Sequence, residues 1–131
     1  MNATDSVLAA AAKIVDDFGH HRTADYFAGF AAEATFLFYT HTERLDSRAA
    51  YESLWAKWES EDGFKVHSCR SSHQKVQLIG EDAAVFTHLV SSDIEFGGEV
   101  STIEERETIV FAKYGEHWLA VHEHLSPESA S

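Results

Sequence analysis

The chain closes on the stretch HWLAVHEHLSP, residues 117–127. Side chains of an extended strand alternate between two faces, so this stretch is predicted to put Trp118, His122 and His124 on one face. Glu123 and the aliphatic side chains then lie on the other face. An indole and two imidazoles on a common surface indicate a sheet whose two sides differ in chemistry.

Helical periodicity stops near residue 64, and strand periodicity replaces it. Residues 5–18 carry an apolar stripe at helical spacing, and Thr23 and Ser47 are predicted to cap two further helices, the first with an apolar side from Tyr26 to Ala34. The segments predicted as strands, bounded by turn residues, are 34–40, 64–79, 83–96, 100–114 and 117–125. This order predicts an α+β fold, with three helices on the concave face of a strongly bent antiparallel sheet.

The charge balance excludes two classes of partner. The chain has 22 acidic and 10 basic residues, a formal net charge of −12, and no cluster of Lys and Arg. Neither nucleic acid nor an anionic membrane is therefore an expected partner. No uncharged run approaches the roughly 18 apolar residues of a membrane-spanning helix.

One domain over residues 4–126 is expected, followed by a short tail at 127–131. The single Cys69 excludes an intrachain disulfide and has no motif that would make it a reactive nucleophile. Residues 1–5 lack the features of a signal peptide, so a cytoplasmic location is expected. No cofactor is predicted.

Several short motifs resemble a known superfamily. They are the turn at Gly80–Ala84, the Arg106-x-Thr108 pair, the Trp118-x-x-x-His122-x-His124-x-Ser126 ending, and the helix start at Ser47–Tyr51. Together they resemble the nuclear transport factor 2-like domains, which have a cystatin-like fold. The similarity is to the SnoaL-like branch and to the association domain of calcium/calmodulin-dependent protein kinase II. This resemblance implies a cone-shaped domain with a deep cavity, association through the outer sheet face, and diverse functions.

The resemblance implies that the cavity binds a small molecule. The side chains expected to line it are Tyr26, Tyr51, Trp55, Arg106, Thr108, Trp118, His122 and His124. A guanidinium and two imidazoles favour a carboxylate ligand, and His122 or His124 is the candidate general acid or base. The structural alternative is that Arg106 pairs with Glu104 or another interior carboxylate and that the imidazoles only satisfy buried polar groups. The stretch 99–107 is acidic at alternating positions, which indicates that this face meets water. Glu105 and Glu107 are then expected to point away from Arg106 and Thr108.

Other chemistries remain open at this point. His122 and His124 have a spacing that suits two metal ligands, but no third ligand is placed by spacing, so no metal site is predicted. Isomerase- or cyclase-like catalysis is one option, although the strand position of the general-base Asp in related steroid isomerases is approximately Phe38 here. The alternative function is a non-catalytic association module. A homodimer through the face carrying Leu119, Val121 and Leu125 is expected in either case.

Overall fold

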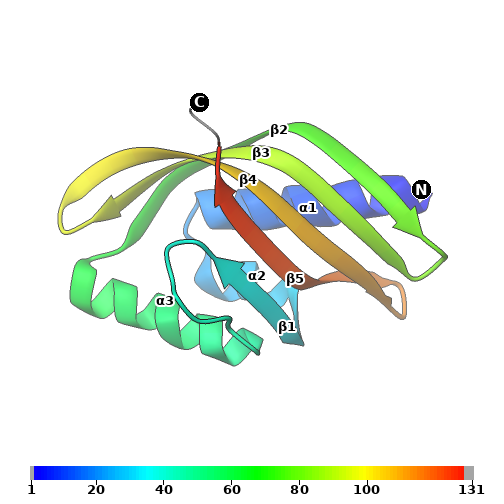
Figure 1. Cartoon of the computed structure of the whole chain (residues 1–131), viewed down its shortest axis with the longest axis horizontal. Helices are drawn as coiled ribbons and strands as arrows, with labels where there is room; N and C mark the ends of the chain where they lie inside the picture. The colour runs from blue at the N-terminus through cyan, green and yellow to red at the C-terminus, as the bar shows by residue number, and fades with distance from the viewer. Residues whose placement is uncertain (1, 129–131) are drawn as a thin grey trace.

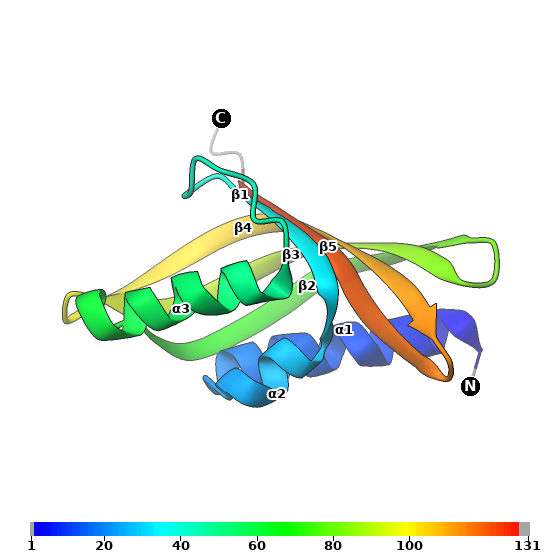
Figure 2. The ribbon, with the colours of Figure 1, turned by 90° about the horizontal axis from the view of Figure 1, so that it is seen from below.

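The strands and the helices form two layers, seen in Figure 1 for a computed structural model that describes residues 2–128. Five strands make one curved sheet, and the three helices lie on its concave side (Figures 1 and 2). The predicted α+β class and the switch from helices to strands near residue 64 are confirmed. The predicted tail at 127–131 falls mainly on residues 129–131, which lie outside the described residues.

Capping chemistry explains the ends of the third helix but not the start of the second. The predicted cap Thr23 is the first residue inside that helix, and no side chain caps it. The helices are α1 (Ala3–Gly19), α2 (Thr23–Ala28) and α3 (Arg48–Asp62). The Ser47 side chain accepts a hydrogen bond from the Ala50 N–H at 3.1 Å, as predicted for the start of α3. Gly63 ends that helix with a φ of +60°, a backbone conformation that favours glycine. Within residues 2–128, no helix is both long enough and apolar enough to cross a membrane.

The second helix is shorter than its apolar pattern predicts. It ends at Ala28, and β1 begins at Phe30, inside the stretch predicted as helical. The Gly29 carbonyl accepts a hydrogen bond from the Ala120 N–H at 2.9 Å, which joins this segment to the sheet. A Cβ at Gly29 would also meet Cγ1 of Ile14 at 2.9 Å. Tertiary contacts with α1 and with the last strand therefore end this helix early.

The sheet is antiparallel except at one edge. Its strands are β1 (Phe30–Phe38), β2 (Lys65–Ile79), β3 (Ala83–Phe96), β4 (Glu99–Tyr114) and β5 (His117–Pro127). Their order is β1-β5-β4-β3-β2, and β1 pairs with β5 in parallel. The prediction of an antiparallel sheet is correct for the four long strands. It is wrong for β1, which precedes α3 in sequence and joins the free edge of β5.

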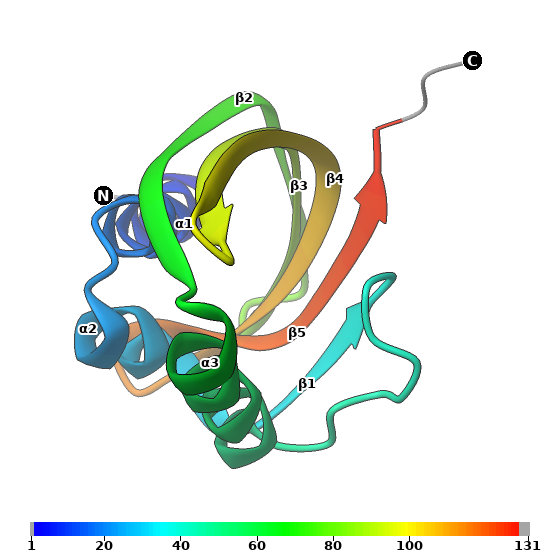
Figure 3. The ribbon, with the colours of Figure 1, turned by 90° about the vertical axis from the view of Figure 1, so that its left-hand side faces the viewer.

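The interior lies between the arch of the sheet and the helices. Figure 3 shows β2, β3 and β4 curling over this space while α2 and α3 close its open side. Aromatic rings fill much of it, since Phe30, Phe36, Trp55, Phe86 and Phe111 are all at most 1 % exposed. The same curvature leaves room between the layers that side chains do not fill, and this room is the cavity described below.

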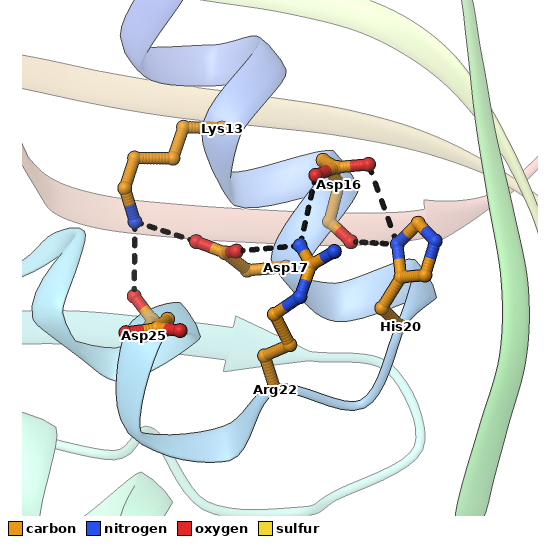
Figure 4. A network of polar contacts seen from close by, with 6 residues as sticks. All are labelled: Lys13, Asp16, Asp17, His20, Arg22 and Asp25. Carbon is orange, nitrogen blue, oxygen red and sulfur yellow. Dashed lines mark hydrogen bonds and ion pairs between the residues drawn. The ribbon is translucent and has the colours of Figure 1, made fainter.

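The corner between α1 and α2 is held by charges. Asp17, which is 5 % exposed, accepts hydrogen bonds from Lys13 Nζ at 2.6 Å and from Arg22 at 3.1 Å. Arg22 also reaches Asp16 at 2.8 Å, and His20 lies beside that carboxylate (Figure 4). A buried carboxylate needs such partners. The network therefore accounts for the polar side chains of His20 and Arg22 in the turn.

Candidate functional site

A bulge in β5 changes which of its side chains face the interior. Ala120 pairs with Phe111 and points inward, but the next pair across the two strands is His122 with Val110. Val121 is therefore an extra residue on β5 with no counterpart on β4. An insertion of this kind shifts the alternation of side chains by one position. Every residue after Val121 faces the side opposite to the one that simple alternation predicts.

Glu123 consequently faces the interior, and the two imidazoles face outward. Glu123 pairs with the fully buried Ile109 and is 4 % exposed, whereas His124 is exposed. The His122 ring contacts Oγ1 of Thr35 on β1 at 2.8 Å, and partial burial lowers the pKa of this imidazole. The prediction that His122 and His124 line the cavity is wrong, and neither is placed to act on a ligand there.

Arg106 and Thr108 lie on the same outer face as the imidazoles. The sheet register sets Thr108 between Thr87 of β3 and His124 of β5, and Lys75 of β2 continues this row. A shallow outer groove of about 550 Å³ joins these residues to Arg106, which is exposed. The sequence therefore grouped Arg106, Thr108 and His124 correctly but assigned them to the wrong side of the sheet.

Three carboxyl side chains occupy the interior instead. Glu105 and Glu107 share the inner face of β4 with Ile109, and Glu123 approaches them from β5. The interpretation of the acidic stretch 99–107 as water-facing is wrong at these two positions. They do point away from Arg106 and Thr108, as alternation predicts. The chemistry of the interior is thus acidic.

The carboxyl groups line the inner end of a cavity. This end has a volume of about 50 Å³ and adjoins an outer part of about 190 Å³. Residues that line both parts are Phe18, Tyr51, Ser92, Glu105 and Leu125. The walls of the outer part are mainly apolar and come from Phe38, Trp58, Phe64, Ile94, Phe96 and Ile103.

The exposed residues among those that line the outer part place the mouth of the cavity. The β3–β4 hairpin, which contributes one of them, is nearest the viewer in Figure 3. Thr40, in the loop after β1, and Phe96, at the β3–β4 hairpin, both line the outer part and are both exposed. A ligand would therefore enter between this loop and this hairpin, pass the aromatic wall and reach the carboxyl groups last.

A chain of hydrogen bonds fixes the orientation of Glu107. Nε2 of His88 lies 2.6 Å from Glu107 Oε1, and because an ionised carboxylate only accepts, Nε2 carries the proton. Nδ1 of His88 then accepts from the Ser71 hydroxyl, whose oxygen accepts in turn from the Gln74 amide at 2.9 Å. The His88 side chain is fully buried. The three hydrogen bonds of this chain all run toward Glu107.

The carboxyl groups of Glu107 and Glu123 are neighbours at the inner end of the cavity, and each affects the pKa of the other. Burial, and then the charge of Glu107, raises the pKa of Glu123 well above its ordinary value. Burial alone would also raise the pKa of Glu107, but hydrogen bonds from Glu123 and His88 lower it. Glu123 is therefore the protonated member and Glu107 the ionised member of the pair.

One oxygen of Glu123 has no protein partner. Its Oε1 atom is buried and has no hydrogen-bond partner among residues 2–128, while the side chain lines the inner end of the cavity. Buried polar atoms without partners are rare in folded proteins, and each calls for an explanation. A group on a bound molecule would supply the missing partner.

Tyr26 and Tyr51 are the two predicted site residues that do lie at this cavity. Their hydroxyl oxygens are 3.0 Å apart, and burial, followed by the charge of Glu123, raises the pKa of both phenols. Trp55 packs behind them in the core, with no described partner for its indole nitrogen. Trp118 is buried but lines a separate hollow near the start of α1.

Two other kinds of site are not supported by the geometry. Within the described part of the chain, no three side chains of His, Cys, Asp or Glu converge as metal ligands would. Cys69 lines the inner end of the cavity, but burial raises the pKa of its thiol to about 11. A thiol that stays protonated at neutral pH is a poor nucleophile.

Sequence reasoning missed His88 and the three carboxyl groups, although β4 held a signal. Glu105 and Glu107 stand at alternate positions in one series with Ile103, Ile109 and Phe111, and such a series marks the buried face of a strand. His88 stands in a comparable series on β3. Glu123 also alternates with Leu119, Val121 and Leu125, but Trp118 and Ala120 make the opposite face of this strand apolar as well. Alternation therefore does not show which face is buried, and the bulge leaves no mark in the residue pattern.

Comparisons with known proteins identify the family and the fold. The family model described as the SnoaL-like domain matches residues 7–129, which is nearly the whole chain. No curated protein matches.

Solved structures with the same fold include three similar chains. An NTF2-like protein of unknown function from Prochlorococcus marinus is 19 % identical, with a TM-score of 0.78 and coverage of 100 % of this chain and 97 % of that one. An NTF2-like protein from Cytophaga hutchinsonii is 12 % identical, with a TM-score of 0.82 and coverage of 98 % and 100 %. The CaMKII hub homology domain of Chlamydomonas reinhardtii is 17 % identical, with a TM-score of 0.75 and coverage of 98 % and 100 %. At these identities the likeness establishes the fold.

Proposed function

The chain belongs to the SnoaL-like domain family, and we propose that it binds a small organic molecule in its interior cavity, where Glu107 and Glu123 exchange a proton with that molecule. One observation carries the proposal. Glu123 is a buried carboxyl group that keeps an oxygen without a protein partner at the inner end of a cavity open to solvent. An apolar pocket with a few converging polar groups is the usual form of a ligand site.

The size and the walls of the cavity limit the ligand. The outer part, at about 190 Å³, is smaller than the roughly 300–1,000 Å³ of sites for drug-sized ligands, so the ligand has the size of a single substituted ring. Trp58 and Phe64 supply an aromatic wall for its body. The carboxylate ligand expected from the sequence does not suit this interior, because Glu105, Glu107 and Glu123 would repel it.

The carboxyl pair is suited to general acid and general base work. A protonated Glu123 donates and an ionised Glu107 accepts, and both line the inner end of the cavity, away from its mouth. Environments that push the pKa values of neighbouring carboxyl groups apart commonly mark acid and base roles. The bond from His88 holds Glu107 in place while it accepts. The proposed proton-transfer residues are therefore Glu107 and Glu123 in place of His122 and His124.

A fragment library that contains cations, anions and neutral compounds tests the cavity by 1H–15N NMR. We expect the compounds that bind to shift the amide signals of Phe18, Tyr51 and Leu125. Ser92→Phe fills the cavity from β3 and should abolish these shifts, whereas Ser91→Phe, the same change one residue away on the outer face, should preserve them. Shifts confined to the outer face, or none at these three residues, would refute the proposal.

A second function is favoured by the outer face. Val85 pairs with Val110, and Ala112 pairs with Leu119, which gives a half-exposed apolar strip across β3, β4 and β5. Apolar strips of this kind are common association surfaces. A solved neighbour is described as a hub homology domain, which suits the same use of this face. Leu125, predicted to belong to the strip, faces the cavity instead.

Association through this strip is compatible with ligand binding inside the cone, because the two surfaces lie on opposite sides of the sheet. Light scattering should give the mass of a dimer for the native chain, and Val110→Glu should shift the mass toward a monomer. A monomer at micromolar concentration before any substitution would exclude this second function.

A further inference from the structure

The charge of the cavity points to a more specific class of ligand. Three carboxyl groups line its inner end, and the residues that line either part include no Lys, Arg or His in the described chain. Two neighbours provide hydrogen bonds from outside the cavity. His88 donates to Glu107, and the Tyr39 hydroxyl donates to Glu105 at 2.8 Å. The interior thus has acceptors for a cation and supplies no cation of its own.

The buried Glu123 oxygen without a hydrogen-bond partner is a second, independent sign. The side chain is 4 % exposed, and its Oε1 atom is the polar atom left without a partner at the inner end of the cavity. This atom can accept a hydrogen bond whether or not the other oxygen carries a proton. The missing group is therefore a hydrogen-bond donor, and an N–H donor with a positive charge would also compensate the carboxyl groups around it.

The walls suit the same class of ligand. The rings of Phe18, Phe38, Tyr51, Trp58 and Phe64 line the outer part of the cavity. Aromatic faces attract organic cations, and the attraction is stronger where water is excluded. An aromatic or aliphatic body with an ammonium end would place its charge on the carboxyl groups and its body among the rings.

We propose that the ligand of this cavity is a protonated primary or secondary amine, with its N–H groups at Glu123 and Glu105 and its apolar body between α3 and the mouth. This inference rests on the proposed function, because it names the class of molecule that the same cavity binds. A neutral alcohol could satisfy Glu123 Oε1 but would leave the acidic end uncompensated. An anion would add a like charge to three carboxyl groups.

Binding of an ammonium group has a consequence for protons. The cavity starts with one proton shared by Glu107 and Glu123, and a bound cation favours ionisation of both carboxyl groups. The displaced proton goes to solvent. The other titratable groups facing this pair are His88 on β3, Glu105 on β4, Cys69 on β2, Tyr26 on α2 and Tyr51 on α3. The side chains that α1 contributes to the cavity are apolar.

Three probe molecules of similar shape separate the contribution of the ligand's charge to binding from the contribution of its apolar body. They are 2-phenylethylamine, 2-phenylethanol and phenylacetate, titrated by calorimetry at pH 7 in two buffers with different ionisation enthalpies. We expect the amine to bind at least tenfold more tightly than the alcohol, phenylacetate to bind most weakly, and the amine alone to release protons, up to one per site. Equal or tighter binding of the alcohol would overturn the inference.

Matched variants show which carboxyl groups cause the preference for the amine over the alcohol. Glu123→Gln should reduce the ratio of amine to alcohol affinity to about threefold or less, and Glu105→Gln should reduce it in part. Glu104→Gln removes the same charge from the exposed outer face and should leave the ratio unchanged. A ratio that falls equally in all three variants would show that overall charge, and not the cavity, selects the amine.

Failure of this inference can be told from failure of the proposed function. If neutral library compounds shift the cavity signals and amines do not bind more tightly, the cavity binds ligands but the inference about charge is wrong. If no compound of any charge shifts those signals, the proposed function itself fails. Titration of the wild-type protein with the three probes tests the preference for an amine even if a variant does not fold.

Discussion

Replacing each member of the buried carboxyl pair by glutamine should have opposite effects, although the chemical change is the same. Glu107→Gln removes the anion that accepts from His88 at 2.6 Å and from Glu123. Hydrogen bonds to a charged group contribute about 1.5–3 kcal/mol, so this variant should lose about 2–3 kcal/mol. In a domain of 131 residues each kcal/mol lowers the Tm by about 4 °C, which gives a fall of about 8–12 °C.

Glu123→Gln should be nearly neutral at low pH and stabilising at high pH. An amide N–H can donate to Glu107 as the carboxyl O–H does, so little is lost at pH 5. The pKa of Glu123 is raised by burial and by Glu107, so its contribution to stability is present below the ordinary pKa of 4.5 and is lost as pH rises toward the folded-state pKa. Each unit of that rise lowers the stability of the native chain by about 1.4 kcal/mol. The variant has no such loss.

Calorimetric melting of the native chain and of both variants between pH 5 and pH 8 tests this assignment. The difference in Tm between Glu123→Gln and the native chain should grow in favour of the variant as pH rises. Equal losses in both variants, or a Glu123→Gln variant that is relatively less stable at pH 8 than at pH 5, would show that the proton does not reside on Glu123.

Three further results are expected. Cys69, whose thiol pKa is raised by burial to about 11, should react with iodoacetamide at pH 8 much more slowly than a free thiol, and reaction at the free rate would mean that the thiol is accessible. Tyr51→Phe removes the partner of the Tyr26 hydroxyl, whose oxygen lies 3.0 Å away, and should lower the free energy of unfolding by about 1–2 kcal/mol in urea titrations. No change in that free energy would show that this hydrogen bond does not stabilise the fold. Small carboxylates should bind the outer groove weakly, with a several-fold loss in Arg106→Ala by thermal shift, whereas Arg44→Ala, on the loop after β1, should have no effect.

The fold could be predicted because its determinants are local. Ser47 and Gly63 mark the ends of α3, and the glycine turns separate the long strands, so these boundaries follow from capping and turn chemistry. The early end of α2 could not be predicted, since it depends on contacts of Gly29 with α1 and β5. Those contacts join segments far apart in sequence.

The site was predictable only in part. The positions of Tyr26 and Tyr51 at the cavity could be predicted from helical periodicity, because periodicity determines which side of a helix faces the sheet. Glu105 was misassigned because charge was taken as a sign of exposure, although its place in an apolar series favours burial. The orientation of His122 depends on one unpaired residue, and the energy that places a bulge comes from the packing of the whole strand.

The unpaired residue Val121 determines which side chains of β5 face the interior, and a regular pairing would place different ones there. If Val121 were paired in a regular ladder, the two imidazoles would enter the cone, and the carboxyl group of Glu123 would leave it. Deleting Val121, in contrast, would straighten the strand and keep the present partners, because His122 already pairs with Val110. The position of a single insertion, without any change of side chain, therefore decides whether this scaffold holds basic or acidic chemistry. A related protein could exchange one for the other by moving the insertion along the strand.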